Sequence, residues 1–559
     1  MKAIKMTRMP IGVDDFAKAR EKYYFVDKTE ELGRLLEDLA EVTLITRPRR
    51  FGKTLTLSTL RYFLDSEDAE AHRKLFDGLA ITKNPAAMVM QGTRPVLFLS
   101  LKDWKAKNWE EMQGTIRYYL SELFDQQRYL LNARDISVRG RSVFEQLQKS
   151  EAGLPVCRAA LKFLLQAMEA YYGRKPVLLI DEYDVPIQSS WEHEYYEDGI
   201  DFFRGFLTAA LKSNNALDFA VLTGVLRISK ESIFSDLNNL RVDSLTASKY
   251  PTLIGFTKDE VAVMAADLGH ADKMPELARW YDGYRISGYE IYNPWSVVNY
   301  FDNDCTPRPY WGNTSGNVIL QEMLHEVDTD TMETLQGVLL GQPIVTEVRE
   351  SFIYSEIYQN PTALYTMLLT TGYLTSEREE AADFGETTNL IIPNREVLNL
   401  YRIEVIDRMS GCRLSMGASN LLRAFLAGKT DVVQTGMSQY LENLASFFDT
   451  ADKESFYHGF LLGMTALLVP DYEVRSNRES GYGRYDVAAF PKEDQPSGIV
   501  LEFKVADEGD DLAGKAAEAL AQIETKDYLA EFRSRKTPTV YGYGLAFYGK
   551  KMQVMCKRF

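Results

Sequence analysis

The most constraining feature of this chain is a short loop between an apolar run and a helix-forming stretch. Residues 47–54 read RPRRFGKT and directly follow the apolar run Val42–Thr46. A buried strand and a loop closing on Gly-Lys-Thr hold nucleotide phosphates, because backbone N–H groups of the loop and the next helix N-terminus face the anion. Lys53 would reach the β- and γ-phosphates, and the Thr54 hydroxyl would ligate Mg²⁺. The loop residues expected around the nucleotide are Arg49, Arg50, Phe51, Gly52, Lys53, Thr54 and Leu55.

The loop departs from the usual pattern at its opening. Arg47 stands where a glycine is usual, and Pro48 removes one N–H donor. Guanidinium groups bind phosphate well, so the three arginines of the loop could compensate. The alternative is that Gly-Lys-Thr only begins an ordinary helix.

A second segment supports the nucleotide interpretation. Residues 177–184 read VLLIDEYD, four apolar residues followed by acids. Such a run suits a parallel strand buried on both faces, and ligands of open α/β sheets bind at carboxyl ends of strands. Asp181 would hold Mg²⁺ through water, and Glu182 would orient or deprotonate the attacking water. Tandem acids also occur as plain solvated strand ends, but together with the Gly-Lys-Thr loop they predict an ATP site.

Alternation of strand and helix defines the expected fold of this part. Further core strands are predicted at 95–101, 218–224 and 253–256, with helices at 54–65, 109–126, 156–172 and 198–213. This order predicts an α/β domain with a mostly parallel sheet and helices on both faces. Thr223, which ends one strand, could sense the γ-phosphate. Arg227 could stabilise charge on the transferring phosphoryl group, or it could be a surface arginine.

A second chemical region lies near the other end. Residues 499–505 read IVLEFKV, which places Glu502 and Lys504 on one strand face and Ile499, Leu501, Phe503 and Val505 on the other. Asp486 precedes the apolar run 487–490 and is expected to begin a neighbouring strand. Two acids converging from adjacent strands form an oxygen-ligand site for Mg²⁺, and Glu479 is a further acid nearby.

A helix predicted at 512–532 places Gln522 and Lys526 on one side, where they could meet a phosphodiester. The ordered series Glu479, Asp486, Glu502, Lys504 and Gln522 predicts a metal-dependent nuclease. The alternative for Glu-x-Lys is a salt-bridged strand surface.

At this point the chain resembles a known family. It is similar to bacterial AAA-ATPase-like proteins that carry a C-terminal nuclease of the PD-(D/E)XK superfamily. The motifs that carry the resemblance are YFVDKT (24–29), RPRRFGKT (47–54), LIDEYD (179–184), LTGVLRISKES (222–232), WYDGY (280–284), YNPWS (292–296), GRYD (483–486) and LEFK (501–504).

The resemblance covers nearly the whole chain and implies three parts. It implies a P-loop, AAA-like ATPase domain at 1–256, a helical and winged-helix-like middle region at 257–440, and a nuclease-like domain at 441–559. It also implies ATP and Mg²⁺ as cofactors, nucleic acid as partner with DNA ahead of RNA, and a position near the adenine for residues 24–29. Arg in place of the first loop glycine is usual in this family. Tyr485 replaces the proline of the superfamily motif, at a position that varies widely.

Composition limits the remaining classes. The 4 cysteines are far apart with no Cys-x-x-Cys, which indicates neither a disulfide framework nor a zinc site. The N-terminus has no apolar core, and the longest apolar stretch, 460–469, is too short to cross a bilayer. We therefore expect a soluble cytoplasmic protein without membrane partners, and the sequence leaves room for an oligomer.

Charge and the middle region are ambiguous. A net charge of −16 argues against a protein that coats nucleic acid, whereas residues 531–559 carry a balance of +6, either a phosphate-binding face or an ordinary basic terminus. The aromatics of 257–300 could stack on bases or hold a domain interface. A helix at 363–369 and a hairpin with arms 373–375 and 390–392 suggest a winged-helix-like module, either DNA-binding or a lid.

Three hypotheses follow. Nucleotide state could gate a metal-dependent nuclease, the chain could be a nucleotide switch whose nuclease-like domain only binds, or both folds could be an inert scaffold. The presence of every expected catalytic residue disfavours the third.

Overall fold

The computed structural model consists of two compact units. One comprises Met1–Thr314 and Val345–Asn394, and the other comprises Ser315–Ile344 and Arg395–Phe559. The structure describes residues 8–38, 40–133, 138–228, 238–312, 329–339, 341–348, 354, 360–377, 387–401, 415–443, 457, 461, 464–465, 468, 471–480, 483–492 and 495–559.

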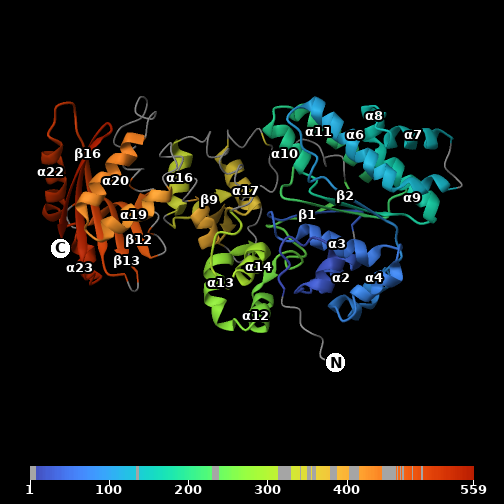
Figure 1. Ribbon diagram of the computed structural model, residues 1–559, viewed down its shortest axis with the longest axis horizontal. Coiled ribbons are helices and arrows are strands. Elements are labelled where there is room, and N and C mark those ends of the chain that lie inside the picture. The colour runs from blue at the N-terminus through green and yellow to red at the C-terminus, as the bar shows by residue number, and fades with distance from the viewer. Residues whose placement is uncertain are drawn as a thin grey trace. The chain divides into compact units, whose positions relative to one another are not determined.

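A five-stranded parallel sheet forms the centre of the first unit. Its order is β2-β3-β4-β1-β5, with bounds β2 Val96–Ser100, β3 Val177–Asp181, β4 Ala220–Gly224, β1 Val42–Thr46 and β5 Leu240–Asp243. Strands β1, β3 and β4 are buried at every residue, as their continuous apolar runs predict. Helices cover both faces: α2 (Thr29–Glu37), α3 (Lys53–Leu64) and α4 (Ala69–Leu75) lie on one side, and α6 (Trp109–Gln126), α9 (Ala160–Tyr172) and α11 (Tyr196–Leu211) on the other (Figure 1). The α/β fold expected from the alternating pattern is confirmed.

One predicted strand is wrong. The fifth strand of this sheet is β5, not residues 253–256, and Phe256–Thr257 instead forms β6 in a separate small sheet. The sequence of β5 is Leu-Arg-Val-Asp, which lacks the apolar run of an inner strand because β5 is an edge strand.

The predicted helices appear with small shifts of their ends. They are α3 Lys53–Leu64, α6 Trp109–Gln126, α9 Ala160–Tyr172 preceded by α8 Leu154–Arg158, and α11 Tyr196–Leu211. The remaining helices before β4 are α1 Phe16–Lys22, α2 Thr29–Glu37, α4 Ala69–Leu75, α5 Pro85–Met88, α7 Val138–Gln148 and α10 Val185–Glu192.

A helical module follows the sheet within the same unit. It contains α12 Lys258–Asp267, α13 Met274–Tyr281, α14 Pro294–Asp302 and a small sheet of order β6-β8-β7, with β7 Tyr284–Ile286 and β8 Tyr289–Tyr292. Tyr281, Tyr292 and Tyr300 are fully buried in its core. These aromatics are therefore packing residues, not a base-stacking surface.

The predicted helix and hairpin are also present. Helix α17 spans Pro361–Thr371, and β10 Thr375–Ser376 pairs antiparallel with β11 Thr387–Ile391. A third strand, β9 Ile344–Glu347, completes a sheet of order β10-β11-β9. Gly283 has a φ of +96°, and a Cβ there would lie 2.0 Å from the carbonyl oxygen of Pro393, so only glycine fits this approach.

The second unit contains a mixed sheet. Its order is β12-β13-β14-β15-β16, and only the β14–β15 pairing is parallel. The bounds are β12 Tyr472–Ser480, β13 Gly483–Pro491, β14 Gly498–Val505, β15 Val540–Tyr548 and β16 Lys551–Arg558, with helices α16 Thr329–Leu339, α19 Ser415–Leu426, α20 Thr430–Asn443, α22 Leu512–Thr525 and α23 Ala530–Ser534.

The faces of β14 separate as the sequence predicts. Ile499, Leu501 and Phe503 belong to the core that includes α19 and α20, whereas Val500 packs with Ile523 of α22 on the opposite face. Glu502, which alternates with them, therefore lies on the α22 side.

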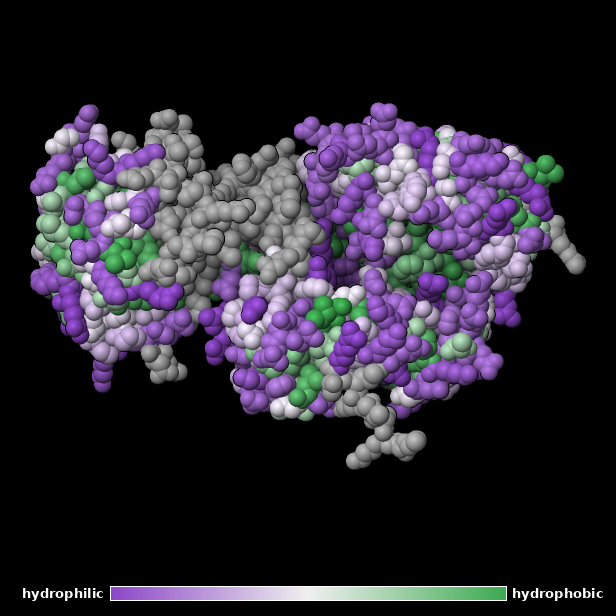
Figure 2. All heavy atoms as spheres, in the orientation of Figure 1, coloured by the Kyte–Doolittle hydropathy of each residue, from purple (hydrophilic) through white to green (hydrophobic). Residues whose placement is uncertain are grey.

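The described surface on the face shown in Figure 2 is mainly polar. In the view of Figure 2, hydrophilic residues cover most of the described surface, with apolar residues in small separate patches. Across the described residues, no helix has both the length and the apolarity required to cross a membrane.

Candidate nucleotide and nuclease sites

The phosphate loop ends in a glycine that the backbone requires. Gly52 has a φ of +102° and precedes the first residue of α3, Lys53. This left-handed conformation favours glycine, although a Cβ would meet nothing within 4 Å. The Lys53 side chain is buried, and Nζ donates hydrogen bonds of 2.9 Å to the carbonyl oxygens of Arg47 and Pro48. The ammonium group is thus held inside the curve of the loop.

Two predicted site residues from separate segments, Thr54 and Thr223, both contact a third, Asp181. The Thr54 hydroxyl donates to Oδ2 of Asp181 at 2.6 Å, and the Thr223 hydroxyl donates to Oδ1 at 2.5 Å. The adjacent parallel strands β3 and β4 bring Asp181 and Thr223 to the same sheet edge. A carboxylate and hydroxyls are the oxygen donors that Mg²⁺ prefers, so the donor set fits a nucleotide-bound Mg²⁺.

Glu182 follows directly, in an unusual backbone conformation. Its φ is +54°, in the region that non-glycine residues rarely occupy. Burial raises the pKa of Glu182 and the neighbouring Asp181 carboxylate adds to this, whereas Lys53 opposes it. A carboxylate with a raised pKa is a better proton acceptor near neutral pH.

Tyr183 and Asp184 have structural tasks that the sequence did not reveal. The Asp184 carboxylate accepts backbone N–H bonds from Val225 and Leu226 at 2.8 and 2.9 Å. The Tyr183 hydroxyl donates to the Leu226 carbonyl at 2.6 Å and accepts from the Ile228 N–H at 3.2 Å. Together they fix the segment after β4 that carries Arg227. The only signal was their place directly after Asp181-Glu182.

The loop arginines differ in environment. Arg49 donates to the Gln188 side chain at 2.9 Å, and the Arg50 guanidinium lies 4.0 Å from the centre of the Trp295 ring. Arg47, in contrast, is fully buried and forms an ion pair with Asp243 at 2.6 Å. The expectation that all three arginines are available to phosphate is therefore wrong for Arg47.

The side chains of two other predicted site residues, Phe51 and Leu55, mainly pack within the protein. Phe51 is buried, with its ring edge-on to Tyr284 at 5.0 Å, and Leu55 is half-buried in the first turn of α3. Phe51 could contact a nucleotide only through its backbone, and Leu55 through its backbone or the exposed part of its side chain. That contact stays a prediction.

Tyr24 and Lys28, in the segment 24–29, form polar contacts to helix α12. The Tyr24 hydroxyl donates to Asp267 at 2.7 Å, and Lys28 forms a partly buried ion pair with Glu260 at 2.5 Å. Burial of Tyr24 and its bond to Asp267 raise the pKa of the phenol. A position beside the adenine stays a prediction.

In the nuclease-like unit, two predicted acids meet across adjacent strands. Antiparallel pairing of Val487 with Leu501 brings Asp486 of β13 beside Glu502 of β14. Asp486 Oδ2 accepts the backbone N–H of Phe503 at 2.8 Å. From α22, the Gln522 amide donates to Oε1 of Glu502 at 2.5 Å.

The electrostatics of this pair are unbalanced. Oε2 of Glu502 is buried, and it has no hydrogen-bond partner in the described part of the chain. Burial raises the pKa of Glu502, the charge of Asp486 raises it further, and Lys504 opposes both. A divalent cation between the two carboxylates would pair the buried oxygen and remove the repulsion. The residues therefore fit a metal ion.

For the other predicted residues of this site, Lys504 and Glu479, the structure shows fewer contacts. Lys504 is half-buried on β14 and acts electrostatically on Glu502. Glu479 lies on β12 opposite Arg484, but its side chain lies outside the described ones. Among the described side chains, no group of three or more His, Cys, Asp or Glu could hold a metal. The two described carboxylates thus carry the metal prediction.

Tyr528 is a neighbour that the sequence did not indicate. Its hydroxyl lies 3.2 Å from the Gln522 amide nitrogen, and burial raises the pKa of the phenol. The structure also places Lys526 at the end of α22, where its backbone N–H bonds to the Gln522 carbonyl at 2.9 Å.

The basic terminus is partly neutralised, since at least three of its seven basic residues form ion pairs. Arg533 pairs with Asp527, Arg535 pairs with Glu473 and Glu531, and Lys557 pairs with Glu524. These pairs favour the ordinary-terminus alternative over a phosphate-binding face.

Comparison with known proteins gives two family-model matches, one in each part of the chain. Residues 10–234 match the family model described as "Predicted AAA-ATPase", and residues 452–557 match that of the PD-(D/E)XK nuclease superfamily. The chain thus joins an AAA-ATPase-like domain to a C-terminal PD-(D/E)XK nuclease superfamily domain, which confirms the resemblance. It is also similar to an "Uncharacterized protein in vnfD 5'region" of Azotobacter chroococcum mcd 1, 26% identical over 539 residues, covering 95% of each chain.

Proposed function

We propose that the protein binds and hydrolyses ATP and that its nucleotide state gates a Mg²⁺-dependent nuclease acting on nucleic acid, with DNA ahead of RNA. The observation that carries the nuclease half is the buried oxygen of Glu502 beside Asp486, which has no hydrogen-bond partner among the described residues. Such an arrangement is costly unless a cation completes it. We place the protein in the cytoplasm, with no membrane partner.

At the nucleotide site, Mg²⁺–ATP would supply the phosphoryl group and its counter-ion. Lys53 would leave the carbonyl oxygens of Arg47 and Pro48 for the phosphates, and Thr54 and Asp181 would hold the cation. Glu182 would accept the proton of the attacking water. Thr223 and Arg227 would face the terminal phosphate.

At the nuclease site, a divalent ion would supply both an activated water and charge stabilisation. Asp486 and Glu502 would hold it, with the Phe503 carbonyl as a further ligand and Glu479 as an additional acid. Lys504 would hold the attacking water or the scissile phosphate. Gln522 would keep Glu502 in place through the bond at 2.5 Å.

A second candidate function is a nucleotide switch whose nuclease-like domain binds nucleic acid or protein without cutting. The net charge of −16 and the partial ion pairing of the basic terminus favour it, because both reduce attraction to phosphate backbones.

One set of assays separates the candidates. Plasmid, single-stranded DNA and RNA are incubated with the protein and Mg²⁺ or Mn²⁺, with and without ATP, and calorimetry measures ATP binding. We expect cleavage that depends on metal and changes with ATP, and ATP binding that Lys53→Ala weakens. Absence of ATP binding by the parent would refute the nucleotide half. ATP binding without cleavage under any condition would favour the switch.

A further inference from the structure

Arg47 replaces the loop-opening glycine and is anchored to the edge strand. Its guanidinium donates to the Asp243 carboxylate at 2.6 Å, to the Asp243 carbonyl at 3.0 Å and to the Ser248 hydroxyl at 2.8 Å. The side chain is 0% exposed. A bidentate planar donor suits such a fixed set of acceptors, which a lysine could not satisfy.

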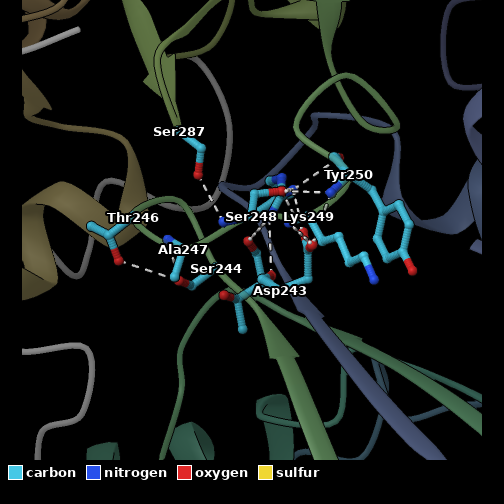
Figure 3. Close-up of polar contacts among 10 residues, drawn as sticks. Asp243, Ser244, Thr246, Ala247, Ser248, Lys249, Tyr250 and Ser287 are labelled. Carbon is cyan, nitrogen blue, oxygen red and sulfur yellow. Dashed lines mark hydrogen bonds and ion pairs between the residues drawn. The ribbon is translucent and has the colours of Figure 1, made fainter. Parts of the chain in front are cut away.

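The acceptor side is equally constrained. Beyond Arg47, the Asp243 carboxylate accepts from the Ser248 hydroxyl at 2.7 Å and from the backbone N–H groups of Lys249 and Tyr250 at 2.7 and 3.1 Å. The Ser248 N–H donates to the Ser287 hydroxyl at 2.7 Å. Figure 3 shows residues 244–250 folded around Asp243, with Ser287 approaching from another segment. The Asp243 carboxylate is thus held in one position by hydrogen bonds from both sides.

Arg47 also contacts the candidate nucleotide site, through its backbone carbonyl. The carbonyl oxygens of Arg47 and Pro48 are the two acceptors of Lys53 Nζ, each at 2.9 Å. A continuous chain of contacts therefore runs from Asp243 through the Arg47 side chain to the carbonyls that place the Lys53 ammonium.

We propose that Arg47 and Asp243 are a positioning pair for the phosphate loop, which sets the loop backbone so that Lys53 can meet the phosphates of ATP. This proposal rests on the proposed ATP binding and adds a specific device to it. Neither residue touches the nucleotide; both act through the loop.

The physics of buried ion pairs allows a clean separation from a merely structural role. Replacing both members by apolar residues of similar volume is often neutral or stabilising, whereas removing one leaves a buried charge. A double variant Arg47→Met/Asp243→Asn should therefore fold, because it removes both charges and keeps a side-chain oxygen as acceptor for the N–H groups of Lys249 and Tyr250. If the pair is only packing, that variant keeps ATP binding; if it positions the loop, binding falls.

The experiment compares the full-length parent, the double variant and a control variant Arg94→Met/Asp218→Leu, which removes a half-exposed ion pair of 2.6 Å in the same unit. Calorimetry measures ATP binding, thermal melting measures stability, and hydrogen exchange of nucleotide-free protein reports on residues 47–54. We expect at least about tenfold weaker ATP binding and faster loop exchange for the double variant alone, at near-parental melting temperature. Steady-state kinetics should show a raised KM for ATP with a smaller change in kcat.

The outcomes are distinguishable. A parent that binds no ATP refutes the proposed function and the pair's role in it. A parent that binds, with a double variant that binds equally well, refutes only the positioning role. Should the double variant not fold, Ser248→Ala removes one contact to each partner: weaker ATP binding and faster exchange of 47–54 would support the proposal, and parental values would overturn it.

Discussion

The two candidate sites differ in how their acids are held. In the ATPase-like domain Asp181 accepts from Thr54 and Thr223 on its two oxygens, and Asp184 accepts two backbone N–H groups on Oδ2, while its buried Oδ1 has no partner among the described residues. Lys53 has two carbonyl acceptors. In the nuclease-like domain, Glu502 keeps one buried oxygen without a partner in the described chain, beside a second carboxylate.

The difference indicates what each site needs before its ligand arrives. At the candidate nucleotide site the Lys53 ammonium and the Asp181 carboxylate already have protein partners, which they would exchange for contacts to Mg²⁺–ATP. The nuclease site is electrostatically incomplete, so its geometry and its protonation should depend on metal. Disrupting the first should change affinity and rate at constant stability, whereas the second should show linkage among metal, pH and stability.

The largest effect is expected at the incomplete site. Asp486→Ala should lower cleavage by at least about a thousandfold, because the metal supplies both nucleophile and charge stabilisation. A plasmid-cleavage assay measures it, with exposed Asp471→Ala as the matched control. ATP binding should survive. Parental cleavage by Asp486→Ala would show that the site is assigned wrongly, whatever the function.

Lys504→Ala tests the same site from the cation side. It should also abolish cleavage, while Mn²⁺ binding measured by calorimetry stays close to the parent's, because the ammonium acts on water or phosphate and not on the metal. A loss of metal binding equal to that of Asp486→Ala would contradict this division of roles.

In the nucleotide site, Glu182→Gln should slow ATP hydrolysis by about a hundredfold to a thousandfold and leave ATP affinity nearly unchanged. The amide keeps the shape of the side chain but cannot accept the proton. Phosphate release measures the rate and calorimetry the affinity, with Glu197→Gln, an exposed position on α11, as the control. Hydrolysis at the parental rate would exclude Glu182 as the base.

The pH dependence of metal binding sharpens the contrast further. The raised pKa of Glu502 means that this carboxyl retains its proton above the ordinary glutamate value of 4.5. The folded metal-free state is thus favoured at low pH and loses that stability as pH rises from the ordinary pKa toward the raised one. Metal binding must displace the proton, so Mn²⁺ affinity should rise with pH by up to about tenfold per unit in that window.

Calorimetry in buffers of different ionisation enthalpy measures the released proton directly. Glu502→Gln should release none and should bind Mn²⁺ with little dependence on pH. Equal proton release by the parent and by Glu502→Gln would contradict the assignment of the titration to this carboxyl.

The sequence predicted what local pattern determines. Strands β1 and β3 are apolar and buried at every residue, and their motifs place Lys53, Thr54 and Asp181 without further information. Strand β5 escaped prediction because Arg241 and Asp243 break its apolar run, and the partner that buries Asp243 is 196 residues away in the chain. No local pattern reveals such a partner.

The same reason explains the missed site residues. Tyr183 and Asp184 bond to a segment some forty positions later, at separations of 41 to 45 residues. In the nuclease-like domain, Asp486 and Glu502 followed from strand alternation, whereas Tyr528 meets Gln522 only because the chain turns back after α22. Residue types and strand faces were predictable, but long-range hydrogen bonds were not.

The smallest expected effect tests whether internal hydrogen bonding of the nucleotide site matters for rate. The Tyr183 hydroxyl bridges the Leu226 carbonyl and the Ile228 N–H, and so holds the segment that carries Arg227. Tyr183→Phe removes one hydroxyl and leaves the buried ring, so the loss is about 1 kcal/mol, equivalent to about fivefold. Because the loop faces the terminal phosphate in our proposal and not the adenine, kcat should fall by that factor while ATP affinity stays constant. Tyr171→Phe, at an exposed tyrosine of α9, should change neither quantity. A loss of affinity with constant kcat would instead mean that this segment supports binding, and that its hydrogen bonds serve to hold nucleotide more than to hydrolyse it.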